Sequence, residues 1–228
     1  MFDREADRYD AWFESAHGRP LFASEVLCVQ EASRGLARPW LEVGVGTGRF
    51  AEALGIGTGV DPAPVALGYA ARRGVRTVAA RGETLPFAEG QFGAVFVIVT
   101  LCFAAAPVRL LREAARVTGG SGGVVLGIVP AEGPWGQFYA AKGRAGHTFY
   151  SEARFFRLAE LEHLAQTAGL SVERSVSTLF QGPGHGPYTL ESPRAGAHGG
   201  SGFVAMLCRP RARDAAPAGT TRVSHAEE

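Results

Sequence analysis

The chain has 228 residues, of which 46% are hydrophobic and 20% charged, a composition that predicts one globular α/β domain. Its formal net charge of +1 excludes the strongly basic surface that nucleic acid or an anionic membrane would need, and favours a small-molecule partner. The three cysteines are far apart, the N-terminus is charged and the apolar runs are short, so we expect no disulfide framework, no metal site, no membrane span and a cytoplasmic location.

The first part of the chain, residues 1–36, is predicted to form a helical cap. Apolar side chains recur at helical spacing both before and after Gly18-Arg19-Pro20, where we expect a break between two helices. The aromatic residues Tyr9, Trp12 and Phe13 cluster before that break.

Strand and helix patterns then alternate along the middle of the chain. The run at 92–100 is apolar on both faces, which is typical of a central parallel strand. The alternation predicts a parallel sheet with right-handed crossovers and helices on both faces. The strands are expected at 39–45, 58–60, 76–79, 92–100 and 123–129, and the helices at 49–54, 64–73 and 108–117.

The remainder of the chain completes a single domain over residues 1–209. Segment 131–156, rich in glycine and aromatic residues, is predicted to be an insertion or lid, and a helix follows at 158–168. Strands at 172–179 and 202–208, with no helix between them, predict an antiparallel hairpin at one sheet edge. Between them, 181–200 has the composition of a long mobile loop, and 210–228 that of a disordered tail.

The stretch from Leu41 to Phe50 carries the strongest functional signal. An apolar strand runs into glycines at 44, 46 and 48, which lets backbone amides approach a ligand where a Cβ would clash. A dinucleotide fingerprint would have its third glycine at the position of Arg49, so the loop disfavours NAD. Without Gly-Lys-Ser/Thr, the loop is not a phosphate-binding P-loop either.

Two acids flank this loop in the sequence. Asp61 ends the second strand, where a carboxylate can accept hydrogen bonds from ribose hydroxyls, although it could instead cap the next helix. Glu42 lies inside the first strand, two residues before Gly44. It is a candidate ligand-binding acid, and the alternative is a strand-end acid paired with a nearby arginine.

Together, these motifs resemble the class I S-adenosylmethionine-dependent methyltransferases, in particular the small-molecule subgroup. The resemblance covers roughly residues 37–130. It implies a Rossmann-like doubly wound sheet, mostly parallel with an antiparallel edge strand, beneath the helical cap. The residues that carry it are Glu42 to Gly48, Gly59 to Pro62, Gly82 to Phe87, Gln91-Phe92, Leu110 to Val117 and Gly119 to Gly123.

The resemblance also implies a set of cofactor-binding residues. The glycines would pass under the methionine and ribose, Glu42 would lie near the methionine amino group and Thr100 near the methyl group. Arg81 and Gly93 depart from the family pattern, and Arg81 leaves the contact with the adenine amino group open. The full set is Tyr9, Glu42, Gly44, Gly46, Gly48, Asp61, Pro62, Gly82, Glu83 and Thr100.

Methyl transfer from a sulfonium is an in-line displacement that a protein can catalyse by positioning the reactants and excluding water. The sequence contains no catalytic triad. The best base candidates are His17 and His147, for which an exposed or structural histidine is the alternative. Segment 131–156, which follows the fifth strand, is rich in aromatic residues and could form a pocket for an apolar or cationic acceptor. The alternative is that this segment only packs on the sheet. The predicted pocket residues are Trp12, Cys102, Phe103, Trp135, Tyr139 and Tyr150.

We therefore predict an enzyme that converts S-adenosylmethionine to S-adenosylhomocysteine while methylating a small molecule. Two rival hypotheses stay open at this stage. One is a nicotinamide-dependent oxidoreductase, against which Arg49 argues. The other is a module that binds S-adenosylmethionine without turning it over.

Overall fold

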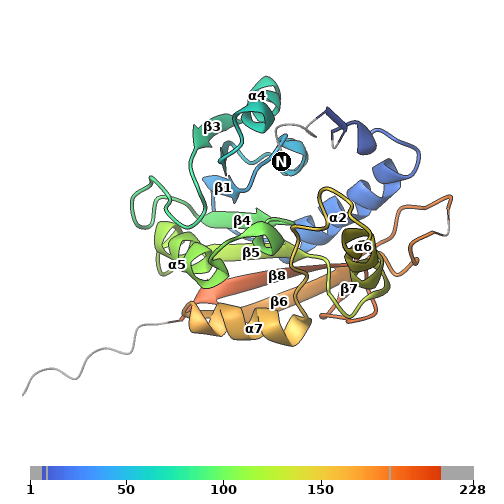
Figure 1. Ribbon diagram of the computed structural model, residues 1–228. Helices are drawn as coiled ribbons and strands as arrows, with labels where there is room; N and C mark the ends of the chain where they lie inside the picture. The colour runs from blue at the N-terminus through green and yellow to red at the C-terminus, as the bar shows by residue number, and fades with distance from the viewer. Residues whose placement is uncertain (1–6, 9, 185, 212–228) are drawn as a thin grey trace, which may run out of the picture.

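An eight-stranded mixed sheet forms the centre of the computed structural model, which describes residues 7–8, 10–184 and 186–211 (Figure 1). The strand order is β3-β2-β1-β4-β5-β8-β6-β7. The strands are β1 Trp40–Val43, β2 Thr58–Asp61, β3 Arg76–Ala79, β4 Ala94–Ile98, β5 Gly123–Ile128, β6 Leu170–Thr178, β7 Arg194–Ala195 and β8 Phe203–Pro210.

Helices cover both faces of this sheet, as the alternating pattern predicts. On one face α2 packs against β5, β6 and β8; on the other, α5 and α7 pack against β4, β5 and β6 and against each other. Each face has its own apolar core, because the central strands are buried on both sides. The helices are α2 Gly18–Ala32, α3 Arg49–Leu54, α4 Pro64–Arg72, α5 Pro107–Thr118, α6 Pro134–Arg144 and α7 Leu158–Thr167, with a 3₁₀ turn, η1, at Leu101–Phe103.

The predicted N-terminal break coincides with the start of α2. Gly18, Arg19 and Pro20 form the first turn of this helix, where the missing amide hydrogen of proline has no cost. The Oγ atom of Ser15 accepts a hydrogen bond from Gly18 N at 2.8 Å and satisfies one of the free amides at the helix end. Residues 10–12 before it are also helical, so the cap has helical segments on both sides of this start.

The C-terminal strands confirm the expected fold class and add one detail of order. β8 runs antiparallel to β5, and β6 runs antiparallel to β8, so β8 lies inside the sheet between them. Residues 203–208 of β8 are all buried, as an interior strand requires. The outermost strand on this side is the two-residue β7, which pairs with β6.

Composition predicts a mobile loop at 181–200, whereas the structure holds this segment by several specific contacts. The Glu191 carboxylate accepts hydrogen bonds from the backbone amides of Phe180 at 2.8 Å and Gln181 at 3.0 Å. Glu191 N also donates to Ser24 Oγ on α2 at 2.9 Å. The segment therefore folds back onto the N-terminal helix.

Some sequence predictions lie outside the described residues, namely those for Tyr9 and for the tail beyond residue 211. In the part of the chain that is described, no helix is long and apolar enough to span a bilayer. The same residues contain no group of His, Cys, Asp or Glu side chains that could hold a metal ion.

Candidate functional site

The glycine loop connects β1 to α3 at the carboxyl edge of the sheet, where ligands of open parallel sheets bind. Gly44 (φ +75°) and Gly48 (φ +84°) leave no space for a side chain, since an added Cβ would lie 2.2 Å from Thr100 and 2.8 Å from Ala70 Cα. Gly46 also has positive φ, +51°, but a Cβ there would have none of the described residues within 4 Å. Gly46 thus presents bare backbone to open space, as a loop that cradles a ligand must.

Asp61, at the end of β2, braces this loop. Its Oδ2 accepts a hydrogen bond from Gly46 N at 3.0 Å, and its Oδ1 accepts one from Ala63 N at 2.8 Å. The N-cap of α4 is Ala63, so the alternative reading of Asp61 as the helix cap is wrong. A carboxylate at this place, beside the glycine loop, is a group to which ribose hydroxyls can donate hydrogen bonds.

Glu42 is the buried acid beside the loop, with an exposed fraction of 2%. Its Oε2 has no hydrogen-bond partner among the described residues, and no described arginine pairs with it. Burial raises the pKa of this carboxyl well above its usual value, and the negative charge of Asp61 adds to the effect, although a backbone hydrogen bond at Ala51 opposes it. An unsatisfied buried acceptor of this kind fits a donor such as the amino group of a ligand.

Gly82 and Glu83 lie in the connection between β3 and β4, and their local contacts are structural. A Cβ on Gly82 would lie 2.7 Å from Val43 and 2.8 Å from Leu110. The Glu83 carboxylate accepts hydrogen bonds from the amides of Ala105 and Ala106 just before α5. Only backbone groups of this turn are therefore suited to contact a cofactor.

The chain turns sharply at the end of β4, where Val99 has φ +48°, a left-handed conformation rare for a β-branched residue. The turn places Thr100 against the glycine loop, with its Oγ1 donating to Ile98 O at 2.9 Å and lying 3.3 Å from Gly44 O. Thr100 and Cys102 line a small hollow at this strand end together with Phe155. Burial raises the pKa of the Cys102 thiol to about 12, so it serves as a neutral pocket wall.

Arg49 ties the N-terminal segment to the glycine loop, a role that the sequence did not indicate. Its guanidinium donates to both carboxylate oxygens of Asp10, at 2.8 and 2.7 Å, and also pairs with Glu14. Arg73 reaches the same Asp10 at 2.9 Å and donates to Thr47 O at 2.8 Å. Burial alone would raise the pKa of Asp10, but the hydrogen bonds from Arg49 and Arg73 lower it below the usual value.

Replacing Arg49 with methionine should loosen residues 10–17, because Asp10 and Glu14 lose their shared partner. We expect a loss of about 1 kcal/mol in the free energy of unfolding. Hydrogen exchange should become faster in residues 10–17 and stay unchanged in β5. Arg19→Met is the control, since Arg19 also pairs with Glu14 but has a 70% exposed side chain. Equal hydrogen exchange of residues 10–17 in the two variants would show that Arg49 does not hold this segment to the glycine loop.

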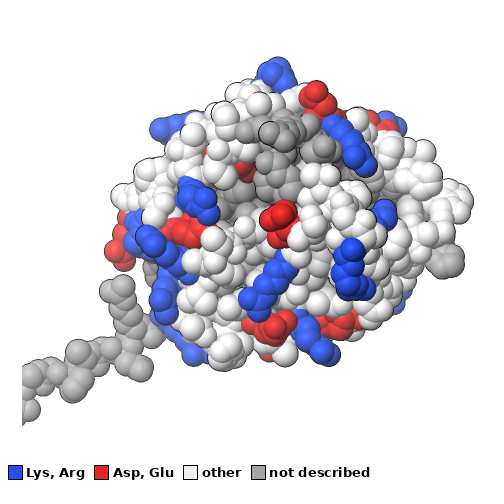
Figure 2. All heavy atoms as spheres, viewed as in Figure 1, with Lys and Arg blue, Asp and Glu red and all other residues white. Residues whose placement is uncertain are grey.

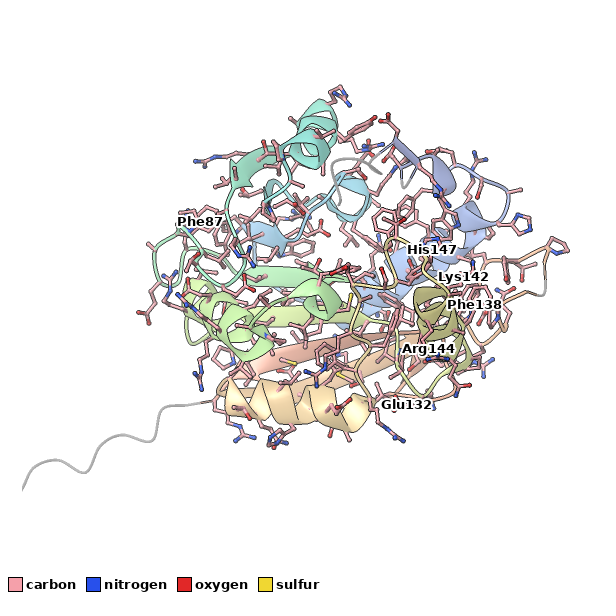
Figure 3. All side chains as sticks on the ribbon, viewed as in Figure 1. Phe87, Glu132, Phe138, Lys142, Arg144 and His147 are labelled. Atoms are coloured by element: carbon pink, nitrogen blue, oxygen red, sulfur yellow. The ribbon has the colours of Figure 1, made fainter. Side chains whose placement is uncertain are left out.

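Aromatic side chains of segment 131–156 and Tyr188, from a distant part of the chain, form a cluster beside the same edge of the sheet. Trp135 of α6 lies 5.6 Å from Tyr139 and 5.5 Å from Tyr188, measured between ring centroids. Tyr139 stacks on Tyr150 at 4.4 Å, and Tyr150 lies 4.6 Å from His147. Figure 3 shows His147 near α6, on the opposite side of the molecule from Phe87. The predicted pocket residues Trp135, Tyr139 and Tyr150 therefore do come together.

The two predicted base candidates lie at opposite ends of this cluster. His147 stands next to Tyr150, whereas His17 lies 6.0 Å from Tyr188. Trp12 points elsewhere: its side chain is 38% exposed and contacts Phe13. Phe103 is on η1, beside Cys102.

Two residues of this region were missed at the sequence level. Tyr188 lies in the segment predicted to be a mobile loop, where composition hides its packing on Trp135. Glu25 lies on the face of α2 that also carries Leu21, Cys28 and Val29. An acid within a buried helical stripe is a signal that could have identified Glu25.

Comparisons with known proteins agree with this geometry. Residues 41–126 match the model of a family described as "Methyltransferase domain". The chain is 33% identical to a Thermotoga maritima protein whose structure is described as a SAM-dependent methyltransferase, possible histamine N-methyltransferase; the match covers 92% of this chain and 98% of that one, with a TM-score of 0.84. The chain therefore belongs to the S-adenosylmethionine-dependent methyltransferases.

Two curated relatives extend the family across distant organisms. The uncharacterized protein Rv2003c of Mycobacterium tuberculosis is 42% identical over 211 residues, which cover 92% of this chain and 74% of the relative. The uncharacterized protein MJ1123 of Methanocaldococcus jannaschii is 31% identical over 184 residues, covering 79% and 86% respectively. Membership of this family implies the use of S-adenosylmethionine, and it leaves the acceptor to be identified.

Proposed function

We propose that this protein binds S-adenosylmethionine in the glycine loop and transfers its methyl group to a small-molecule acceptor. The observation that carries the proposal is the Oε2 atom of Glu42, which no described residue satisfies, beside a loop whose Gly46 has no described neighbour at the place of a Cβ. Glu42 would accept a hydrogen bond from the methionine ammonium group, and Asp61 would accept bonds from the ribose hydroxyls. Family resemblance adds Pro62 and the backbone of Gly82 and Glu83 beside the adenine, and Tyr9 over the methionine carboxylate.

The bound cofactor supplies a methyl group on a positively charged sulfur. Because the leaving thioether is neutral, the protein needs no acid for this step, and its contribution is to position the acceptor and exclude water. Thr100 lies where it can border the methyl group, and Cys102 and Phe155 line the hollow next to it. Segment 131–156, which carries much of the aromatic cluster, would act as the lid over the acceptor.

The surface supports a small acceptor in preference to a nucleic acid. Figure 2 shows positive and negative side chains interspersed over the viewed face, in keeping with the net charge of +1. The Thermotoga maritima relative is described as a possible histamine N-methyltransferase, which makes small amines one class to include in an acceptor screen.

Calorimetry with S-adenosylmethionine and with NADH tests the donor assignment. We expect binding of S-adenosylmethionine only, followed by formation of S-adenosylhomocysteine and one methylated compound when acceptor pools are added. Preferential binding of NADH would favour the oxidoreductase instead. Binding of S-adenosylmethionine with no turnover in any pool would favour the non-catalytic module.

Asp61→Asn should weaken S-adenosylmethionine binding by about 1–2 kcal/mol, because the amide keeps one acceptor oxygen where the carboxylate has two. Binding is measured by calorimetry at constant ionic strength. Glu173→Gln removes a carboxylate of β6 that pairs with Arg209, away from the glycine loop, and should leave the affinity unchanged. An unchanged affinity in Asp61→Asn would remove Asp61 from the site.

A further inference from the structure

Glu25 is a partly buried carboxylate on the inner face of α2, and none of the described residues pairs with it as an opposite charge. It lies on α2, one turn from Leu21 and from Val29, both of which are buried against the sheet. No hydrogen bond or ion pair joins its carboxylate to any described residue, and burial is the sole cause that raises its pKa, to about 8. A partly buried carboxylate without a described charge partner is unfavourable, and a ligand of opposite charge would supply a reason for its presence.

The surroundings of Glu25 include neutral phenols and a neutral thiol, because its face of α2 packs in one apolar core with Trp135, and Tyr139 packs against that core. Burial raises the pKa of Tyr139 and of Tyr150, and the charge of Glu25 contributes to both shifts. Cys28, one turn further along α2, has its pKa raised to about 12 by burial, with a contribution from Glu25. These neighbours can donate hydrogen bonds, but they leave the charge of Glu25 uncompensated.

The aromatic rings near Glu25 are electron-rich groups that attract a cation. Tyr139 and Tyr150 stack at 4.4 Å, and Trp135 lies 5.6 Å from Tyr139. The rings, with the phenol oxygens of the two tyrosines, therefore favour the same positively charged group as the carboxylate. The nearby Lys142 does not fill this role, because its ammonium lies over Phe138, 4.4 Å from the ring centroid (Figure 3).

The cluster is continuous with the strand end where the methyl group would lie. Tyr139 stacks at 6.3 Å on Phe155, and Phe155 lines the hollow shared by Thr100 and Cys102. Ring contacts thus link the aromatic cluster to the end of β4. The sequence alone did not decide between an apolar and a cationic acceptor.

We propose that Glu25, with the rings of Trp135, Tyr139 and Tyr150, binds the ammonium group of the acceptor, and that the acceptors are small protonated amines. The inference rests on the proposed function and names the substrate class of the same site. It assigns Glu25 to recognition and makes no claim about which atom of the acceptor is methylated.

Binding of matched amines and alcohols tests this inference on the wild-type protein. We would titrate protein saturated with S-adenosylhomocysteine with phenethylamine, tyramine and isoamylamine, each paired with the alcohol of the same carbon skeleton. At least one amine should bind ten-fold or more tightly than its alcohol. If no amine binds more tightly than its alcohol, the inference is overturned without the use of any variant.

Glu25→Gln provides the second arm, because it removes the charge at nearly constant volume. This variant should bind the amine preferred by the wild-type protein at least ten-fold more weakly, and its affinity for S-adenosylhomocysteine should be unchanged. Glu31→Gln is the control, since it removes a partly exposed carboxylate from the same helix and should change neither affinity. Equal amine affinities in the two variants would overturn the assignment of Glu25.

Calorimetry with S-adenosylmethionine distinguishes a failure of this inference from a failure of the proposed function on which it rests. If the protein fails to bind S-adenosylmethionine, the proposed function itself fails. If donor binding is normal while alcohols bind as tightly as amines, the methyltransferase proposal stands and only the amine inference is lost.

Discussion

Replacing Gly46 with alanine is expected to lower the affinity for S-adenosylmethionine by about 100-fold, or roughly 3 kcal/mol. The residue has φ +51°, and its missing Cβ points into open space. A methyl group there would occupy the cradle in which the cofactor is proposed to lie. It would also strain the loop amide that donates to Asp61.

Gly74→Ala is the matched control for this experiment. Gly74 follows α4, has φ +79° and also leaves a Cβ free of neighbours within 4 Å. Both variants should lose about 1 kcal/mol of stability from the left-handed backbone, which melting curves will show. Only Gly46→Ala should lose cofactor affinity in calorimetry. Equal affinities in the two variants would mean that Gly46 serves the turn and not the ligand.

The second large effect concerns stability, and it comes from Glu25. Glu25→Gln should stabilise the ligand-free protein by about 1–3 kcal/mol at pH 9 and by little at pH 5. The range allows for the partial exposure of the side chain. For a chain of this size the melting temperature at pH 9 should rise by roughly 2–4 °C for each kcal/mol.

The direction follows from the raised pKa of Glu25, about 8 in the folded state against an ordinary value of 4.5. The folded state holds the proton more tightly, so the contribution of Glu25 to stability is most favourable below pH 4.5 and is lost as the pH rises through about 8. The raised pKa values of Tyr139, Tyr150 and Cys28 keep those groups neutral across this range.

Other groups near the cluster, including His17, His147, Tyr188 and Arg8, are the same in both proteins. Their contributions cancel when the variant is compared with wild type at each pH. A stability difference that does not grow between pH 5 and pH 9 would show that the Glu25 carboxyl is not desolvated. A variant that gains stability while losing amine binding would display the trade-off typical of binding sites.

Much of the fold could be predicted because its signals are local. The helix at Arg49–Leu54 and the strand at Arg76–Ala79 have the predicted bounds, since glycines mark their ends. The place of β8 inside the sheet could not be predicted, because strand order depends on pairing between β5 and β8, far apart in the chain. The contacts that hold segment 181–200, such as Glu191 to Ser24, are equally non-local.

The candidate site likewise has parts with local sequence signals and parts that depend on non-local packing. The geometry around Asp61 and the glycine loop follows from spacing within one β-α-β unit, so the sequence could indicate it. The sequence offered Arg49 only as an argument against NAD, and it could not show that the partner of Arg49 is Asp10 in the N-terminal segment. Glu25 and Tyr188 meet the aromatic cluster only through tertiary packing, which no spacing rule shows.

The hydrogen bond from Glu191 N to Ser24 Oγ has a consequence for how substrate preference can change within this family. It joins the segment that carries Tyr188 to the helix that carries Glu25, outside the unit from β1 to β4 that surrounds the glycine loop. Under the proposed roles, substitutions in this flanking pair can change the acceptor while donor affinity is conserved. Exchange of segment 181–200 between relatives is therefore a direct route to altered substrate preference in an otherwise constant enzyme.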